Sequence, residues 1–220
     1  MTYKLEFAEL LPYWDVLVKG LIFTIVLTIV STIAGVAVGT AGASARTFGP
    51  KWLDTIVAAY VEIVRNTPFI VQLFFIFFGL PAAGIKLTET TAAFIAMVFN
   101  LGAYCTEIIR AGIEAVPKGH LEAGSSLAMS RIQILRYIVL KQAFQKVYPA
   151  LASQIIIVML GSAVVSQISA EDLTYAANYI QSRNFRAFEV YLVVALLYLL
   201  LAIGARAILR GIGRVIFPKA

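Results

Sequence analysis

The sequence predicts an all-α integral membrane protein. Of its 220 residues, 60% are hydrophobic and only 14% are charged, and the mean hydropathy is +0.87. Soluble domains contain about 45–50% apolar residues, so this composition exceeds what a soluble fold normally carries. Several apolar stretches also approach the ~20 residues that a helix needs to cross a bilayer. We therefore expect a single transmembrane domain over residues 1–220.

Five spanning helices are expected. The first is centred on Gly20 to Ala45, which contains no charged residue. The second should bend near Pro68, because proline lacks the backbone donor that continues a helix. Pro117 and Gly119 end the third span. With their flanks, the expected spans are about 17–45, 53–81, 88–115, 143–169 and 187–212.

The basic residues orient these spans. If the N-terminus lies outside, the inside segments carry twelve lysines and arginines and the outside segments carry five. Cytoplasmic loops of membrane proteins are enriched in Lys and Arg, so the sequence predicts an N-out, C-in topology. Residues 117–142 then form a cytoplasmic loop. The net charge of +6 reflects this bias, and we expect the lipid bilayer, not nucleic acid, as the surrounding partner.

The cytoplasmic loop is a charged, helix-forming insert between two apolar segments. Ser130 and Gln133 match a capping box, which predicts that a helix begins there. A preceding short helix would carry Glu122 in its first turn, and Ala128 and Met129 would form the elbow between two short helices. The apolar residues of both helices need a surface to cover. That surface is either the bilayer or a soluble partner protein.

Three segments and the loop resemble one known family. The segments are VRNTPFIVQLFFIFFGLP at 64–81, AYCTEIIRAGIEAVPKGHLEAG at 103–124 and FEVYLVVALLYLLL at 188–201. The loop follows the pattern EAA, three residues, G, nine residues, I, one residue, LP, with matches at Glu122, Ala123, Ile138 and Leu140. Over roughly residues 15–215, the chain resembles the permease subunits of ABC importers for polar amino acids of the histidine, glutamine and arginine type.

This resemblance implies a type I ABC importer fold and amino acid import across the bacterial inner membrane. Two permease subunits would form the pore, and a periplasmic binding protein would deliver the amino acid. A separate ATPase subunit would bind ATP and Mg. No G-x-x-x-x-G-K-[ST] occurs in the chain, so it has no recognisable phosphate-binding loop of its own. We expect no cofactor and no enzymatic activity in this chain.

The resemblance also implies which residues couple the chain to the ATPase. Small residues in the first loop helix would allow close approach to a groove on that partner. The expected coupling residues are Glu122, Ala123, Gly124, Leu127 and Ala128.

The loop departs from the family pattern at two positions. Ala128 stands where the family has glycine, and Lys141 stands where it has proline. Ala128 adopts either a left-handed conformation, which costs about 1–2 kcal/mol, or a negative φ. Our hypothesis is that this subunit forms one half of a heterodimer whose partner keeps the fuller motif. Neutral drift is the alternative.

Polar residues within the spans are candidates for the translocation path, because buried polar groups in a membrane need partners. Asn100 and Tyr104 share one face of the third span. Ser166 and Gln167 lie at the end of the fourth. These side chains either contact the transported amino acid or form interhelical hydrogen bonds.

A hinge is predicted at Arg65, Asn66, Thr67 and Pro68. Asn66 and Thr67 are expected to cap the helix that continues outward from Pro68. Arg65 at membrane depth is costly without a partner. An ion pair with Glu62 would supply one, and a role at the subunit interface is the alternative.

The rest of the chain suggests structural roles. Residues 169–186 should form a short outer helix that contacts the binding protein or caps the pore. Glu107 is expected to pair with Arg110, and Cys105 to act as a small packing residue. The single histidine and single cysteine rule out a histidine metal cluster and an intrachain disulfide. The competing functions are a self-sufficient secondary transporter or channel subunit, or a membrane enzyme, which the missing catalytic constellation disfavours.

Overall fold

The computed structural model describes residues 4–217, and every regular element in that range is a helix. The 3-10 helix η1 (Phe7–Tyr13) runs directly into α1 (Trp14–Phe48). The other elements are α2 (Lys51–Arg65), α3 (Phe69–Phe74), η2 (Phe75–Gly79), α4 (Leu80–Ala82), α5 (Glu89–Glu114), α6 (Lys118–Ser126), α7 (Arg131–Gln133), η3 (Ile134–Val139), α8 (Leu140–Gly161), η4 (Ser162–Ile168), α9 (Leu173–Asn184) and α10 (Ala187–Ile216).

The long helices have the dimensions of membrane spans. Within the described range, four continuous helical runs are long and apolar enough to cross a bilayer, and a bent pair makes a fifth if it counts as one span. The four runs are Phe7–Phe48, Glu89–Glu114, Arg131–Ile168 and Ala187–Ile216. This agrees with the predicted all-α membrane fold.

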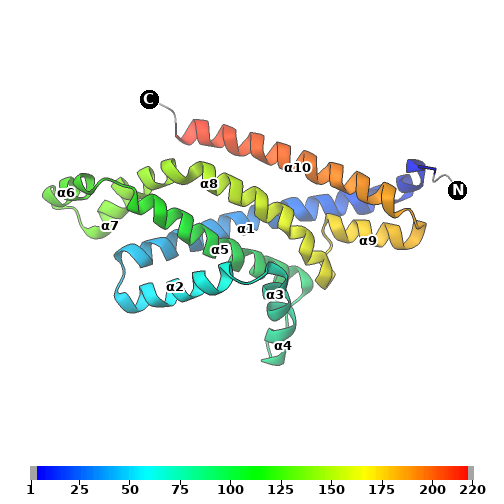
Figure 1. Cartoon of the computed structure of the whole chain (residues 1–220), viewed down its shortest axis with the longest axis horizontal. Helices are drawn as coiled ribbons and strands as arrows, with labels where there is room; N and C mark the ends of the chain where they lie inside the picture. The colour runs from blue at the N-terminus through cyan, green and yellow to red at the C-terminus, as the bar shows by residue number, and fades with distance from the viewer. Residues whose placement is uncertain (1–3, 218–220) are drawn as a thin grey trace.

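The second span is broken at the predicted place. The axis of α2 and the axis of the α3–α4 segment meet at 111° across residues 66–68. Pro68 adopts an extended conformation, with φ −62° and ψ 139°, so it cannot belong to either helix. The predicted bend is therefore confirmed, and it is sharper than a kink in one continuous helix. In Figure 1 the α3–α4 segment projects sideways from the bundle.

Helix α5 lies at the centre of the bundle. Its most extensive contacts are with α1 and α8, and α10 runs beside α8 and α9 (Figure 1). A Cβ added at Gly39 of α1 would lie only 2.3 Å from the Cβ of Cys105 in α5. Small residues allow such close packing between membrane helices. Cys105 is fully buried at this contact, as expected for a packing residue.

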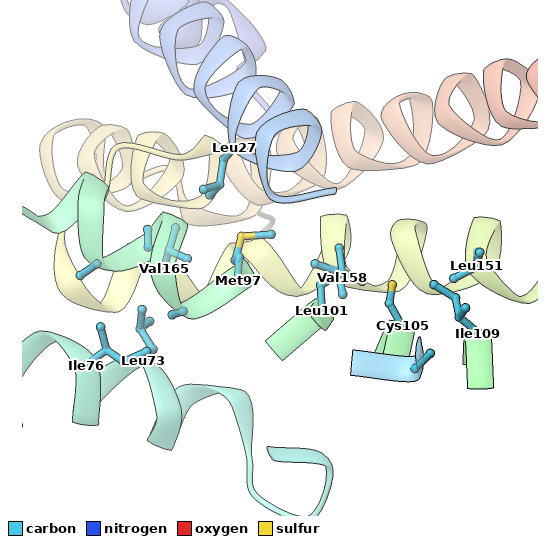
Figure 2. Close-up of a cluster of buried hydrophobic side chains, with 14 of the residues drawn as sticks. Leu27, Leu73, Ile76, Met97, Leu101, Cys105, Ile109, Leu151, Val158 and Val165 are labelled. Carbon is cyan, nitrogen blue, oxygen red and sulfur yellow. The ribbon is translucent and has the colours of Figure 1, made fainter. Parts of the chain in front are cut away.

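The main hydrophobic core surrounds α5. Figure 2 shows Met97, Leu101 and Ile109 of α5 packed among side chains from α1, the α3–η2 segment, α8 and η4. A second cluster joins η1, α1, α9 and α10 at the other end of the molecule. Most of the apolar surface of α10 remains exposed, including Leu196, Leu199 and Leu200.

The charged insert differs from the expected pair of short helices. α6 is short and separate, as predicted. The second helix begins at the predicted capping box and then continues through η3 and α8 as the single run Arg131–Ile168. The fourth span therefore extends into the loop. α6, α7 and the C-terminal end of α10 lie at one end of the molecule, and α9 and the N-terminal end lie at the other (Figure 1).

Candidate functional site

The first candidate surface is the exposed side of α6. Glu122, Ala123 and Ala128 are exposed, and Leu127 is 76% exposed. A large apolar side chain at the tip of a short helix presents a surface that favours contact with another molecule. Four of the five predicted coupling residues thus share an accessible surface.

Gly124 is the exception. It is buried, and a Cβ built on it would lie 2.8 Å from Cδ1 of Ile138 and 3.0 Å from Cγ1 of Ile134. The missing side chain lets α6 pack closely against its own η3 segment. The expectation that Gly124 lines the face toward a partner is therefore wrong in this fold, because that side of the helix is occupied from within.

The elbow after α6 is a Schellman motif with alanine at the left-handed position. Ala128 has φ 55°. The Met129 amide donates to the Gly124 carbonyl at 3.1 Å, and the Ala128 amide donates to the Ser125 carbonyl at 3.0 Å, which are the two bonds of that motif. Of the two conformations left open by the sequence, the strained one is present. For alanine this left-handed conformation is about 1–2 kcal/mol higher in energy, whereas glycine adopts it without that penalty.

Side-chain bonds order the segment around α6. Ser130 and Gln133 form both bonds of the predicted capping box, at 3.4 and 2.8 Å. His120 Nδ1 lies 2.8 Å from Oε1 of Gln142 in α8. The Lys146 ammonium of α8 donates to the carbonyl of Ala115 at the end of α5. A side-chain bond therefore joins α6 to α8, and a second bond joins α8 to the end of α5.

A charged cluster lies at the same end of the molecule. Glu107 pairs with Arg110, as predicted. It also accepts from Arg46 of α1 at 2.9 Å, and Arg46 reaches Asp54 of α2 at 3.1 Å. Arg110 pairs in addition with Glu114. The cluster ties the ends of α1, α2 and α5 together; Arg46, Glu107 and Arg110 are mostly buried, and Asp54 and Glu114 are about half exposed.

A buried hydrogen-bond network holds the hinge of the second span. The Asn100 amide donates to Oε1 of Gln72 at 3.0 Å. Gln72 in turn donates to the Val64 carbonyl at 2.7 Å and to the Thr67 carbonyl at 3.0 Å. Gln72 thus satisfies carbonyls that the break at Pro68 leaves without helical donors. It was not among the predicted site residues, although a lone glutamine in an apolar run four residues after a proline is a usable signal.

Asn66 and Thr67 cap the helix before the break, not the one after it. Asn66 donates to the carbonyl and the carboxylate of Glu62, at 2.9 and 2.8 Å. Thr67 Oγ1 donates to the Ile63 carbonyl at 2.8 Å. The N-cap of α3 is Pro68, which offers no side-chain acceptor. The predicted capping direction was therefore wrong.

Arg65 contacts an aromatic ring. Its guanidinium carbon lies 5.6 Å from the ring centroid of Tyr104 in α5, within the range of a cation–π contact. The expected ion pair with Glu62 does not form, and the Glu62 carboxylate instead accepts from Asn66. This contact therefore joins the end of α2 to α5.

The substrate-path candidates fall into two groups. Asn100 and Tyr104 lie in the hinge region and contact Gln72 and Arg65. Ser166 is buried in η4, where its hydroxyl donates to the Ala163 carbonyl at 2.8 Å, and the neighbouring Gln167 is exposed. Among the described side chains, no hydrogen bond joins one group to the other.

The predicted outer helix is α9, and it begins at a buried acid. Asp172 accepts from the Tyr175 amide at 2.8 Å and from the Tyr198 hydroxyl at 2.9 Å. Burial raises the pKa of this carboxyl to about 6. The adjacent Leu173 amide donates to Thr24 of α1 at 3.1 Å. The sequence alone did not single out Asp172 as an anchor for this segment.

Within residues 4–217, no three His, Cys, Asp or Glu side chains lie close enough to share a metal ion. The described groups form an exposed surface on α6 and a hydrogen-bonded interior at the break in the second span.

Comparison with known proteins identifies the family. Residues 32–217 match the model of the binding-protein-dependent transport system inner membrane component. The glutamine transport system permease protein GlnP of Escherichia coli K12 is 32% identical over 96% of this chain and 97% of its own length. The L-cystine transport system permease protein TcyB of Bacillus subtilis is 35% identical over 84% of this chain and 80% of its own length. Both are named as permease proteins, which agrees with the prediction of a transport component and not an enzyme.

Solved structures show the same fold. An amino acid ABC transporter crystallised with histidines has a chain that is 35% identical, with a TM-score of 0.86 over 96% of this chain and 99% of that one. The MetNI methionine ABC transporter in an inward-facing conformation has a chain that is 23% identical, with a TM-score of 0.72 over 91% of this chain and 98% of that one. The protein is therefore a member of the family of binding-protein-dependent transport system inner membrane components.

Proposed function

We propose that this chain is the membrane-spanning permease subunit of an ATP-driven amino acid importer, that it forms half of the translocation pore, and that it couples to a separate ATPase subunit. The relatives are named for glutamine and cystine transport, and the similar structure is named as an amino acid ABC transporter. These names support amino acids as the substrate class. The single observation that carries the coupling role is the exposed apolar tip of α6, Leu127, next to a helix that bonds to α8 through His120 and Gln142.

The coupling surface in this proposal consists of Glu122, Ala123, Leu127 and Ala128. Gly124 contributes indirectly, by allowing α6 to lie against η3. Closure of two ATPase subunits would push α6, and the bonds from His120 and Lys146 would pass that motion to the spanning helices. ATP and Mg would bind to the ATPase partner.

The proposed orientation is N-out and C-in, in a bacterial inner membrane, with residues 117–142 in the cytoplasm. The twelve inside basic residues support it. So does the grouping of α6, α7 and the C-terminal end of α10 at one end of the molecule (Figure 1). α9 would then face the periplasm, where a binding protein delivers the amino acid.

The proposed translocation path passes the broken second span. Tyr104 contacts Arg65 of the hinge and Asn100 contacts Gln72 just after it, and Ser166 with Gln167 lies at the end of the fourth span. Irregular backbone at membrane depth is tolerated where it lines a cavity or is buried in protein, which suits a gate. A second permease subunit would supply the other half of the pore. We propose a heterodimer, because Ala128 and Lys141 depart from the family pattern.

Reconstitution of the whole transporter tests this function. Proteoliposomes containing the chain with its ATPase, second permease and binding protein should take up radiolabelled glutamine or cystine only with ATP, and vanadate should block uptake. Uptake by this chain alone, without ATP, would instead identify a secondary transporter or channel. Isolation of an active transporter whose only permease is this chain would contradict the heterodimer.

A further inference from the structure

An open groove runs between α8 and the C-terminal half of α10. Its volume is about 1300 Å³, larger than the roughly 300–1,000 Å³ that encloses a drug-sized ligand. Two of its lining residues join the helices, because the Tyr148 hydroxyl of α8 donates to the Leu209 carbonyl of α10 at 2.6 Å. The groove is therefore long, open on one side and bounded by two helices that are fixed to each other.

Three arginines line one wall of the groove. Arg206, Arg210 and Arg214 recur every four residues along α10, a spacing that spans about 12 Å of helix. All three are exposed, and no carboxylate in residues 4–217 forms an ion pair with them. Aspartate and glutamate are also missing from the residues that line the groove. An anion is the complementary ligand.

The opposite part of the groove is apolar. Ile156, Ile157 and Leu160 of α8 line it. α8 and α10 run antiparallel (Figure 1), so these residues lie farther from the C-terminal end than the arginines do. A ligand that fills the whole groove therefore needs an anionic head beside the arginines and a hydrocarbon chain beside the isoleucines.

We propose that an anionic phospholipid occupies this groove, with its phosphate at Arg206, Arg210 and Arg214 and an acyl chain along Ile156 to Leu160. Basic pockets between spanning helices recognise acidic lipid headgroups in this way. A second copy of the chain is a poorer fit, because a symmetric contact through this face would bring two columns of arginine together. The proposal does not depend on the transported substrate.

Native mass spectrometry of the complete transporter, released from nanodiscs of equal phosphatidylglycerol and phosphatidylcholine, tests the proposal. The native chain should retain phosphatidylglycerol preferentially. The triple variant Arg206→Gln, Arg210→Gln, Arg214→Gln should retain it roughly a hundredfold less, at about 1 kcal/mol per arginine and 1.4 kcal/mol per tenfold. The matched control Lys118→Gln, Arg131→Gln, Arg136→Gln removes as much charge outside the groove and should retain lipid normally.

A second pair of variants tests whether lipid retention depends on the space in the groove as well as on its charge. Ala152→Trp fills the groove and leaves the arginines intact, so lipid retention should fall. Ala207→Trp, on α10 outside the groove lining, should have no effect. Equal lipid loss in the two charge-removal triples, or normal retention in Ala152→Trp, would overturn the proposal. Normal lipid retention in Ala152→Trp together with loss of the co-purifying second permease would assign the groove to a protein interface instead.

Discussion

At the elbow after α6, we predict that replacing alanine with glycine increases stability, whereas the same replacement inside a helix decreases it. Ala128 has φ 55°, where alanine costs about 1–2 kcal/mol. Glycine removes that strain but adds about 0.5–1 kcal/mol of chain entropy in the unfolded state. Ala128→Gly should therefore stabilise the elbow by a net amount between about 0 and 1.5 kcal/mol, with a midpoint of about 0.75 kcal/mol.

The matched control lies five residues earlier. Ala123 is exposed within α6 and has ordinary helical conformation. Ala123→Gly carries the entropy cost with no relief of strain, so it should destabilise α6 by about 0.5–1 kcal/mol. The two substitutions are chemically identical, and only the backbone conformation separates them.

Hydrogen exchange measures this difference locally. The amides of Ala128 and Met129 donate the two Schellman bonds, and their protection reports opening of the elbow. Exchange at Met129 should slow in Ala128→Gly and quicken in Ala123→Gly. Faster exchange in both variants would refute the claim that the native elbow is strained.

Three further predictions concern the interior and the outer segment. Gln72→Ala leaves the buried Asn100 amide without its acceptor and should destabilise the fold by about 1–3 kcal/mol in urea unfolding; an unchanged midpoint would contradict the network. Gly39→Ala should lower the free energy of unfolding by about 1–3 kcal/mol, because its Cβ would lie 2.3 Å from the Cβ of Cys105, and it should lower the melting temperature. Gly211→Ala is the control: its Cβ would meet nothing within 4 Å, so it should not lower the melting temperature. The pKa of Asp172 is raised to about 6 from 3.8, so the folded state binds more protons and stability should fall as pH rises from 4 to 6; Asp172→Asn should flatten that slope, and an equally steep slope in the variant would assign it to other groups.

Local sequence signals predicted local structure well. The capping box at Ser130 and Gln133 and the Glu107–Arg110 pair each join residues three apart. Such contacts depend only on helix geometry, so periodicity suffices to find them. The break at Pro68 was also predictable from local sequence, because proline has no backbone N–H to continue the helix.

Contacts between distant helices were not predictable in this way. Arg65 had a carboxylate three residues away, yet it lies over Tyr104 of another helix. Gln72 bonds to Asn100, 28 positions along the chain. Both contacts depend on how α2, α3 and α5 are placed relative to one another. Residue spacing within a single helix does not determine that placement.

Gly124 shows the same limit within the coupling loop. As a small residue in a family motif, it was expected to face the ATPase. Its position against Ile134 and Ile138 follows from α6 folding back on η3, and a single helical pattern does not reveal which face is used inside the chain. The conformation of Ala128 was likewise left open, since alanine alone permits either sign of φ.

Site-directed crosslinking tests the central claim most directly. In a Cys105→Ala background, Leu127→Cys places a thiol on the exposed tip of α6, and Leu11→Cys places one at a site of similar exposure, 76% against 72%, at the opposite end of the molecule. With the complete transporter in membranes, a bifunctional thiol reagent should join residue 127, and not residue 11, to the ATPase subunit, and nucleotide should change the yield. Equal yields at both positions, or a crosslink to the ATPase only from residue 11, would contradict α6 as the coupling element.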